Sequence, residues 1–592
     1  MKRALWLLML AWPAQALDVR VQRADGQPLP LAMVTVTPQM PAPVDRRDNG
    51  YAQPGVRQAG DRWQTAFTDA QGVAHFADLP APVQLRVRRP GFADQHLTGV
   101  APSATPTLVL AAETDPQALA AAKPANVWAA AVPVGTAEQT AQFRMQCGFC
   151  HQQGAPFIRA PHTAAQWQAT TRRMVGYGAR LASAVQALLP DALIAGYAAL
   201  AAHPERLAAP LPWQDALATA HIDEWPLGDA MCQMHDMLVH PNGLVYLGDN
   251  LQDRLYELDP RTGQFTVYKL PRERDDTLGG LFAARLATFP KHDSYLALHS
   301  LAVSAKDGHV FLTPSVQRRL VEFDPRTKAF TVHHLQDGLY PHTVRVDAQD
   351  RVWFTLALSN QVGMLDRATG AQHFIDLPTR SLGEAFTVRL VPLLFKLATL
   401  GLPLAALPID AQASGTPLPY GIDFTPDGVV WVARLHANDL VRIDPVSLAP
   451  TCIAFPALGP RRLRSDAAGN VWITAFAASA ILRYTPATGA FTRYDLPTLP
   501  AGSDTPYALN VDRRRGIVWV TGTASDTLNA LDIATGSWSV FPLPQRMSFT
   551  RDIDITPSGA VFTANGAFPA WQIEGGQPTL IRVTPPWAEE PR

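Results

Sequence analysis

Residues 235–271 read HDMLVHPNGLVYLGDNLQDRLYELDPRTGQFTVYKLP, and the same pattern returns further along the chain. It contains four short apolar runs separated by turn residues such as Pro-Asn-Gly and Arg-Thr-Gly. Related copies occupy 342–378, HTVRVDAQDRVWFTLALSNQVGMLDRATGAQHFIDLP, and 420–456, YGIDFTPDGVVWVARLHANDLVRIDPVSLAPTCIAFP. Short alternating runs between turn signals predict β-strands. Four strands in each copy predict the blades of a β-propeller.

Seven copies are recognisable, which predicts a seven-bladed β-propeller over residues 231–592. Their first residues are His235, His299, His342, Tyr420, Arg461, Tyr507 and Arg551. Unequal spacing between the copies indicates two insertions, one near 275–293 and one containing the apolar segment 386–409. That segment carries Arg389, Lys396 and three prolines, which a spanning helix tolerates poorly. We therefore expect no spanning membrane segment in the mature chain.

The bulk composition predicts a large globular protein of several domains. The chain has 592 residues, 47 % hydrophobic and 17 % charged, with a formal net charge of -1. This length exceeds what one core supports, and the composition is not that of a disordered chain. A nearly neutral balance argues against a nucleic-acid partner.

The first sixteen residues have the pattern of a secretory signal peptide. Lys2-Arg3 is followed by an apolar run to Trp12, and Ala14-Gln15-Ala16 supplies small residues at a cleavage site. We expect residues 1–16 to be removed and the mature protein to be periplasmic. An uncleaved anchor is the alternative, although the apolar run is short for a bilayer.

Residues 18–111 alternate apolar and polar positions between turn signals, which predicts strands and hairpins. The stretches Asp25-Gly26-Gln27-Pro28-Leu29, Thr68-Asp69-Ala70-Gln71-Gly72 and Arg89-Pro90-Gly91-Phe92 resemble the carboxypeptidase regulatory-like family. The resemblance implies a transthyretin-like β-sandwich with a docking role and no chemistry. An Ala/Pro-rich linker is expected over 112–138.

A Cys-x-x-Cys-His motif lies at Cys147, Cys150 and His151 and uses two of the four cysteines. Two thiols three residues apart can both bond to haem vinyl groups, and the next imidazole then reaches the iron. A zinc site needs a second ligand pair nearby, and a redox dithiol needs a βαβ frame. The motif therefore predicts one covalent haem c, with His151 as the proximal ligand.

The surrounding residues 139–203 favour helices and predict a small all-α cytochrome c domain. They resemble cytochrome c domains in which a helix carries the sixth iron ligand, and Met174 occupies the matching place. A thioether ligand raises the potential, which suits electron transfer. The alternative is that Met174 packs in the core and His162 or an open site takes the sixth position.

The first residue of each copy starts the innermost strand of its blade and is expected to face the central channel. Three neighbouring copies offer His235, His299 and His342, which suit a second, softer metal such as copper, iron or zinc, with Asp249 as a further catalytic candidate. The alternative is that the histidines bond to neighbouring blades or help to hold an anionic substrate. The expected substrate-contacting residues are Tyr420, Arg461, Tyr507 and Arg551.

The recurrent PYGI, VWV and Asp-Pro/Thr-Gly signals over residues 231–585 resemble the virginiamycin B (streptogramin) lyase family of seven-bladed propellers. The family resemblance implies a magnesium site built from Glu-x-His and a second glutamate fourteen residues later. Here Tyr340 precedes His342 and Leu356 follows it, so both carboxylates are replaced. The first copy has Gln233, His235 and Asp249 at these places. Without the carboxylates a hard cation lacks its oxygen ligands.

Taken together, the patterns predict a mainly β multidomain protein: a propeller, a β-sandwich and a small cytochrome c domain. The predicted function is that of an exported c-type cytochrome, in which single-electron transfer accompanies substrate binding or oxidation at the propeller. Its expected partners are a small-molecule substrate and a periplasmic electron carrier or redox enzyme. Two alternatives are a lyase-like C–O lyase and a non-catalytic binding or sensing partner of a redox enzyme. Cys232 and Cys452 are a candidate disulfide pair.

Overall fold

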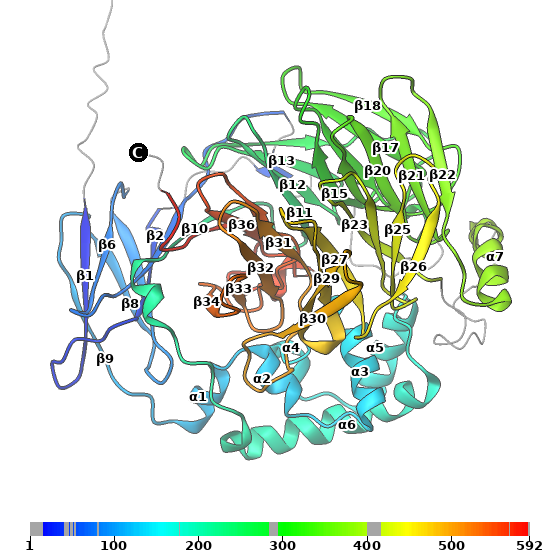
Figure 1. The fold of residues 1–592 in the computed structure, drawn as a ribbon. Coiled ribbons are helices and arrows are strands. Elements are labelled where there is room, and N and C mark those ends of the chain that lie inside the picture. The colour runs from blue at the N-terminus through cyan, green and yellow to red at the C-terminus, as the bar shows by residue number, and fades with distance from the viewer. Residues whose placement is uncertain are drawn as a thin grey trace, which may run out of the picture.

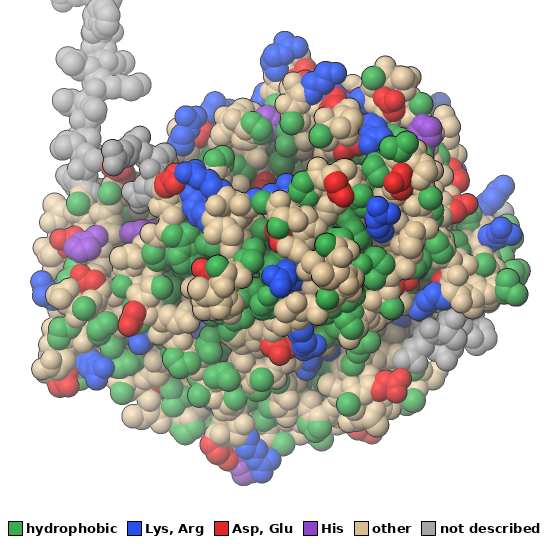
Figure 2. All heavy atoms as spheres, in the orientation of Figure 1, with side chains coloured by type: hydrophobic (Ala, Val, Ile, Leu, Met, Phe, Trp, Pro, Cys, Tyr) green, Lys and Arg blue, Asp and Glu red, His purple; other side chains and the backbone are tan. Residues whose placement is uncertain are grey.

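The chain folds into a large mainly β body with a layer of helices along one side (Figure 1). The computed structural model describes residues 16–592 except 41–45, 48–50, 53–54, 80–81, 177, 283–293, 400–415, 568 and 590–592. Residues 1–15 of the expected signal peptide lie outside the described part of the chain. Lysine, arginine and acidic side chains are interspersed over the face shown in Figure 2.

Six consecutive sheets each contain four antiparallel strands that pair in chain order. They arise where the repeat pattern predicts them, because each apolar run is one strand and each Gly or Asp signal is one turn. The first three sheets are β11–β14 (Met234–Val239, Val245–Asp249, Arg254–Leu258, Phe265–Lys269), β15–β18 (Leu298–Val303, Val310–Pro314, Arg319–Asp324, Ala329–His334) and β19–β22 (Pro341–Val346, Arg351–Leu356, Gln361–Asp366, Gln372–Asp376). The next three are β23–β26 (Pro419–Phe424, Val430–Arg434, Asp439–Ile443, Pro450–Ala454), β27–β30 (Pro460–Ser465, Val471–Ala475, Ala480–Thr485, Ala490–Asp495) and β31–β34 (Leu509–Asp512, Ile517–Gly522, Thr527–Asp532, Trp538–Pro542).

The last group of strands combines both ends of the repeat region. β35 (Asp554–Ile555), β36 (Val561–Ala564) and β37 (Thr579–Thr584) pair in order, and β10 (His221–Pro226) adds the fourth strand. β10 pairs antiparallel with β37 along its whole length, from His221 opposite Thr584 to Pro226 opposite Thr579. A strand from before the first repeat therefore completes the last sheet, and the repeat region begins earlier than residue 231.

This last sheet continues into the N-terminal part of the chain. On its other side β10 pairs with β5 (Trp63–Phe67), which is followed by β2 (Met33–Pro38), β7 (Val83–Arg88) and β8 (Gln95–Val100) in one eight-stranded sheet. A second sheet orders β6 (Val73–Phe76), β1 (Leu17–Arg23) and β9 (Thr107–Leu110), and β3 (Arg46–Arg47) pairs with β4 (Tyr51–Ala52). Apolar side chains from both sheets share one core that includes Val19, Val34 and Val87.

The helical part lies between the N-terminal sheets and the repeats in sequence. It contains α1 (Pro116–Ala121), α2 (Ala125–Ala130), α3 (Ala137–Cys147), α4 (Pro156–Arg159), α5 (Ala164–Gly176) and α6 (Ser183–Ala202). α1 and α2 lie within the expected linker 112–138. Ala120 of α1 and Val127 and Trp128 of α2 are buried in one core with residues of α6, so this stretch is part of the helical domain's packing. Short one-turn helices η1–η3, η5 and η6 occupy Pro204–Arg206, Asp215–Thr219, Gly280–Phe282, Phe476–Ala478 and Ala570–Gln572.

Two helices bear on membrane contact. Among the described residues, α6 is the one helix long and apolar enough to cross a bilayer, by length and composition only. Its Val185, Leu189 and Leu193 lie in the helical core. The apolar segment 386–409 begins in α7 (Leu382–Thr399), which projects at the edge of the body (Figure 1), and its remainder lies outside the described residues.

Candidate functional site

Five of the seven predicted channel residues sit on the first strand of a sheet, next to a break in the strand pairing, whereas Tyr507 and Arg551 lie shortly before β31 and β35. In β11, for example, Met234 pairs with Asp249 and Met237 with Leu247, so the register shifts around His235. The same shift occurs in β15, β19, β23 and β27. A bulge re-aims a side chain away from the regular alternation. The repeat thereby turns one side chain per sheet toward a shared interior.

The three predicted histidines and a tyrosine form a continuous row of rings. The ring centroids of His235 and His299 are 3.6 Å apart, and those of His299 and His342 are 3.9 Å apart. Tyr420 follows at 3.9 Å from His342. All four side chains are buried. These four residues, which start successive copies of the repeat, therefore lie side by side in the structure.

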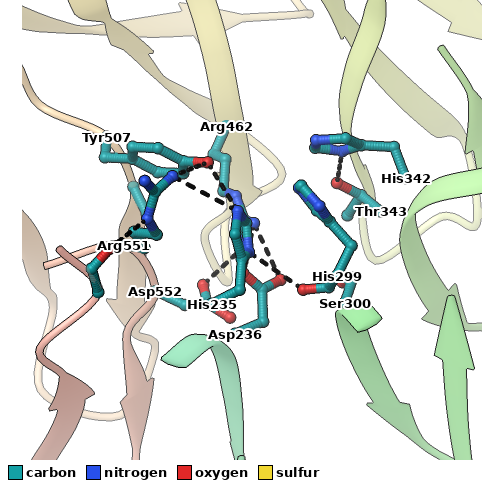
Figure 3. A network of polar contacts seen from close by, with 12 residues as sticks. His235, Asp236, His299, Ser300, His342, Thr343, Arg462, Tyr507, Arg551 and Asp552 are labelled. Carbon is teal, nitrogen blue, oxygen red and sulfur yellow. Dashed lines mark hydrogen bonds and ion pairs between the residues drawn. The ribbon is translucent and has the colours of Figure 1, made fainter. Parts of the chain in front are cut away.

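Hydrogen bonds join the two ends of this row, Tyr420 and His235, through Tyr507, and Figure 3 shows the bond between Tyr507 and His235. Nη2 of Arg461 donates to the hydroxyl of Tyr420 at 2.9 Å, and the hydroxyls of Tyr420 and Tyr507 are 2.6 Å apart. The Tyr507 oxygen lies 3.2 Å from Nε2 of His235, and Nη1 of Arg551 donates to it at 3.0 Å. Tyr507 is thus the meeting point of two guanidiniums, a second phenol and an imidazole.

The protonation of His235 follows from its partners. Nδ1 lies 2.9 Å from Oδ1 of Asp236 and 3.1 Å from the carbonyl oxygen of His299. Both partners only accept, so Nδ1 carries the proton and Nε2 offers a lone pair to the Tyr507 hydroxyl. The arrangement carboxylate–imidazole–hydroxyl allows a proton to pass from Tyr507 to His235.

Burial and nearby charges together set the protonation states of these side chains. Burial lowers the pKa of His235 to about 4, with the nearby Arg551 and Arg462 adding to the effect. Burial, and then the neighbouring histidines, lower the pKa of His299 well below its usual value. Burial opposes ionisation of Tyr507, yet the guanidiniums of Arg461, Arg551 and Arg462 bring its pKa below the ordinary value. The histidines are therefore neutral at neutral pH, while Tyr507 is the more acidic phenol.

A second layer of charged residues supports the row, and sequence reasoning missed it. Arg462 donates to both oxygens of Asp236, at 2.6 and 2.9 Å, and its Nη1 lies 3.0 Å from Asp552. All three are buried; Asp236 lies on β11, Arg462 on β27, and Asp552 just before β35 (Figure 3). Each directly follows a predicted channel residue, namely His235, Arg461 or Arg551. Their shared position, one residue after the predicted channel residue, is the sequence signal that could have identified them.

The Cys-x-x-Cys-His motif lies against this interior. Its helix α3 starts at a capping box, in which Gln139 N donates to Thr136 Oγ1 and Thr136 N donates to Gln139 Oε1, and it ends at Gly148. The ring of Phe149 then meets Tyr420 edge-on at 6.1 Å, and Cζ of Arg461 lies 4.0 Å from its centroid. The middle of the motif therefore contacts the predicted substrate residues.

His151 is tied to the C-terminal part of the repeats. Its Nδ1 lies 3.2 Å from Oε1 of Gln572, in η6, and its ring lies 6.1 Å from that of Phe157. Burial lowers the pKa of His151 to about 4, so its imidazole is neutral, as a metal ligand must be. Burial and the neighbouring Cys150 raise the pKa of Cys147 to about 12.

The donor set of the motif fits a haem c. Cys147 and Cys150 are both free thiols, and Cys150 is close enough to raise the pKa of Cys147. Met174 is half-buried on α5, whose neighbouring Arg173 is near enough to His151 to affect its pKa. His162 instead stacks on Trp167 at 5.0 Å and approaches the Ala160 carbonyl oxygen. A cavity beside His151 holds only about 40 Å³, so a haem enters only with displacement of neighbouring side chains.

Asp249 does not join the histidine row. Its Oδ1 accepts from the backbone N–H groups of Gln233 and Leu251, both at 3.0 Å. Burial raises its pKa to about 7, and Cys232 is among its neighbours. Asp249 thus shapes the turn after β12. Cys232 is buried and Cys452 exposed, and both are free thiols, so they form no disulfide.

The expected second metal finds little support in this geometry. In the part of the chain that the structure describes, two sets of ligand atoms lie within 4.8 Å of one another: Asp307, His309 and Glu322, and Glu273, Asp275 and Asp276. The three channel histidines are not such a set. Both sets already bind arginine, through Arg367 and Arg319. The three guanidiniums around the histidine row also disfavour a cation there.

The positions that the lyase resemblance assigns to carboxylates hold other groups. The Tyr340 ring lies 6.1 Å from that of His342 and 6.3 Å from that of His299, at a backbone φ of 63°. Leu356 is fully buried on β20. The surroundings of His342 are therefore aromatic and apolar where an oxygen-ligated cation would need carboxylates.

Comparison with known proteins agrees with the repeat fold. Residues 405–571 match the virginiamycin B lyase family. Similar solved structures include virginiamycin B lyase from Staphylococcus aureus, at 15 % identity and TM-score 0.46, covering 62 % of this chain and 99 % of that chain. A streptogramin B lyase structure is 16 % identical at TM-score 0.46, with 62 % and 98 % coverage. No curated protein matched the sequence. The chain is mainly β, and residues 405–571 of its repeat region are similar to the virginiamycin B lyase family.

Proposed function

We propose that this protein is an exported c-type cytochrome whose propeller binds and oxidises a small molecule. The observation that carries the proposal is the contact between the Cys147–His151 motif and the channel. Phe149, inside the motif, touches both Arg461 and Tyr420. A haem attached to these cysteines would therefore lie beside the buried polar row. We further interpret the seven groups of four strands as seven blades, the N-terminal sheets as a β-sandwich, and α3–α6 as the cytochrome domain.

The haem, when bound through Cys147 and Cys150, supplies a one-electron acceptor with His151 as its proximal ligand. The polypeptide contributes the complementary proton chemistry. Removing electrons from an organic substrate releases protons, and a base within hydrogen-bond reach accelerates that release. Tyr507 can take such a proton while its own passes to Nε2 of His235, which lies 3.2 Å away. The carboxylate of Asp236 then stabilises the imidazolium that forms.

Substrate binding falls to the arginines at the same place. Arg461 is fully buried and its guanidinium lies between aromatic rings, 3.5 Å from Tyr507 and 4.0 Å from Phe149. Its Nε and Nη1 have no hydrogen-bond partner among the described residues. A negatively charged or carbonyl group of the substrate would satisfy these donors. A periplasmic electron carrier or redox enzyme would then reoxidise the haem.

An absorption spectrum tests the proposal. The full chain is produced in a host with cytochrome c maturation and recorded oxidised, reduced with dithionite, and after treatment with pyridine. We expect a reduced α-band that stays with the denatured polypeptide, which shows covalent attachment. The Cys147→Ser/Cys150→Ser variant should lose it. Absence of covalent haem in the wild-type protein would refute the proposal.

Two methionine variants test whether Met174 is the sixth ligand of the haem iron. Met174→Ala should remove the weak methionine–iron charge-transfer band and shift the haem toward high spin. Met145→Ala is the matched control, because this methionine packs at the mouth of the channel beside Gly459. Identical spectra for wild type and Met174→Ala would assign the sixth position to another group, with His162→Ala as the next variant.

The family match supports one second candidate, a lyase-like elimination enzyme. It predicts cleavage of a cyclic ester that stops with a chelator and with His342→Ala. Turnover that is unaffected by both treatments would exclude this candidate. The redox proposal expects neither dependence on chelators nor cleavage.

A further inference from the structure

A large cavity lies where three parts of the molecule meet, away from the histidine row. Its volume is about 630 Å³. Its walls come from the turn after β7, from α1 and α2, from the connector before η2, and from the sheet β31–β34. Ligand sites of small molecules have volumes of about 300–1,000 Å³ and favour junctions between domains. The cavity has the size and position of a binding site.

Most of the wall is apolar. Phe92, Leu119, Trp213, Leu499 and Val540 all line the cavity. Trp213 is held in place by an edge-on contact of 5.6 Å with Phe67. Such a wall favours an apolar body over a sugar or a nucleotide.

Three cations at this wall lack a carboxylate partner. No carboxylate oxygen of the described residues lies within 4 Å of the charged nitrogens of Arg89, Lys123 or Arg546. Arg89 instead stacks over Trp213 at 5.4 Å, and Lys123 Nζ donates to the Leu207 carbonyl at 2.7 Å. Burial lowers the pKa of both Arg89 and Lys123. The cations therefore lose hydration here without gaining an anion.

The carboxylates that line the cavity already have partners. Asp94 lies 3.5 Å from both Arg86 and Arg88. Oε1 of Glu113 accepts from the backbone N–H groups of Thr114 and Asp115, at 2.8 and 2.9 Å. Asp526 accepts from Gln152 and from the backbone N–H groups of 547 and 548. Asp94 is near enough to Arg546 for the two charges to interact, whereas no carboxylate of the described residues influences the pKa of Arg89 or of Lys123, so the uncompensated charge of the wall is positive.

Two buried polar atoms at the wall are also unpartnered within the described chain. Oδ1 of Asn126 and Oγ1 of Thr498 have no hydrogen bond, and these residues are 2 % and 8 % exposed. The other amide atom of Asn126 is used, because Nδ2 donates to Ser503 Oγ at 2.7 Å. Buried polar atoms without a partner are rare and commonly mark a missing ligand or water.

We propose that this cavity binds a small amphipathic organic anion, with an apolar body against Trp213 and one carboxylate or sulfonate paired with Arg89 and Arg546. The three unpaired cations supply the charge preference, and the apolar wall supplies most of the affinity. Because the walls belong to three parts of the chain, a bound anion would also hold them together. The proposal does not depend on haem attachment.

The test uses fluorescence of anilinonaphthalene sulfonate with the full chain, followed by displacement with decanoate. We expect one site, displacement by decanoate and not by decylamine, and weaker binding at high salt. Arg89→Gln and Arg546→Gln should each weaken binding by about tenfold, whereas Arg89→Lys should weaken it less. The Cys147→Ser/Cys150→Ser variant should bind equally, which separates this site from the redox proposal.

Two control variants make the result specific. Arg326→Gln removes an exposed arginine in the turn between β17 and β18 and should leave binding unchanged. Phe386→Asp alters the exposed apolar surface of α7, where this residue is 67 % exposed. Equal binding by wild type, Arg89→Gln and Arg546→Gln would overturn the proposal. So would loss of the signal in Phe386→Asp alone, or no binding by the wild-type protein.

Discussion

The guanidinium carbon of Arg461 lies 4.0 Å from the centroid of the Phe149 ring, so the thiol motif and the repeat region share a direct contact. We predict that the two side chains are energetically coupled. In a double-mutant cycle of Phe149→Leu and Arg461→Gln, urea unfolding should give a coupling energy of about 0.5–2 kcal/mol. Phe149→Leu combined with Arg464→Gln should be additive, since no contact joins that pair among the described residues. Additivity in both cycles would show that the contact carries no energy.

Arg462 should be the most sensitive arginine of the interior. Arg462→Met leaves Asp236 buried without its guanidinium and leaves Asp552 with only the more distant Arg464, 3.8 Å away, which we expect to cost about 3–5 kcal/mol of unfolding free energy. Arg461→Met is the matched control, because Arg461 pairs with rings and a hydroxyl and not with a carboxylate. Urea denaturation near neutral pH measures both. An equal cost for the two variants would contradict the assigned ion pairs.

The buried histidines should make stability fall in acid. Burial places the folded-state pKa of His299 well below that of the unfolded chain, about 6.5. As pH drops below that value, the His299 imidazole binds a proton in the unfolded chain but not in the folded protein, so the unfolding free energy decreases. His299→Gln should remove about 2 kcal/mol of the loss between about pH 7 and about pH 5. Buried Asp249, whose pKa is raised to about 7, has the opposite dependence.

Because these two groups act in opposite directions, the change in unfolding free energy between the two pH values should be compared between variants and wild type. Urea unfolding at the two pH values measures it. Ser300→Ala is the control, since Ser300 is buried next to His299 and does not titrate. If His299→Gln and Ser300→Ala have the same pH dependence as the wild type, His299 is not buried as a neutral imidazole.

The thiols give a separate check on haem attachment. All four cysteines are free in the structure, with Cys452 exposed and Cys232 buried. We expect Cys452 to react first with a thiol reagent in the native protein and Cys232 only after unfolding. Denatured protein should show two reactive thiols when haem occupies Cys147 and Cys150, and four when it does not. Fewer than two would indicate a disulfide between Cys232 and Cys452.

The repeat fold was predictable because its signal is local and repeated. Each strand is one apolar run, and the first residue of each copy falls on an inner strand or, for Tyr507 and Arg551, shortly before it. The partners of these residues were harder to foresee. Arg462, Asp236 and Asp552 belong to copies of the repeat far apart in sequence, and only the tertiary packing of the sheets brings them together. Periodicity within one copy carries no information about such pairs.

The alanine-rich stretch before the motif shows a second limit. It resembles a linker in composition, yet Val127 and Trp128 bury against α6 and make it part of the helical core. Likewise, Asp249 has the spacing of a ligand in its copy, but backbone N–H groups of Gln233 and Leu251 use its carboxylate. The spacing of a repeat predicts the position of a residue on its strand. The groups that its side chain contacts depend on tertiary packing.

The pairing of β10 with both β37 and β5 has a consequence for the order of assembly. The last group of strands needs residues 221–226 and residues 579–584, so its sheet cannot be completed until nearly the whole chain is present. Until then the edge of β10 that later pairs with β37 is unpaired, and such an edge is prone to pair with other chains. A growing or translocating chain would thus need protection of these edges until its C-terminal strands arrive, and truncation near residue 579 should favour aggregation over a smaller stable product.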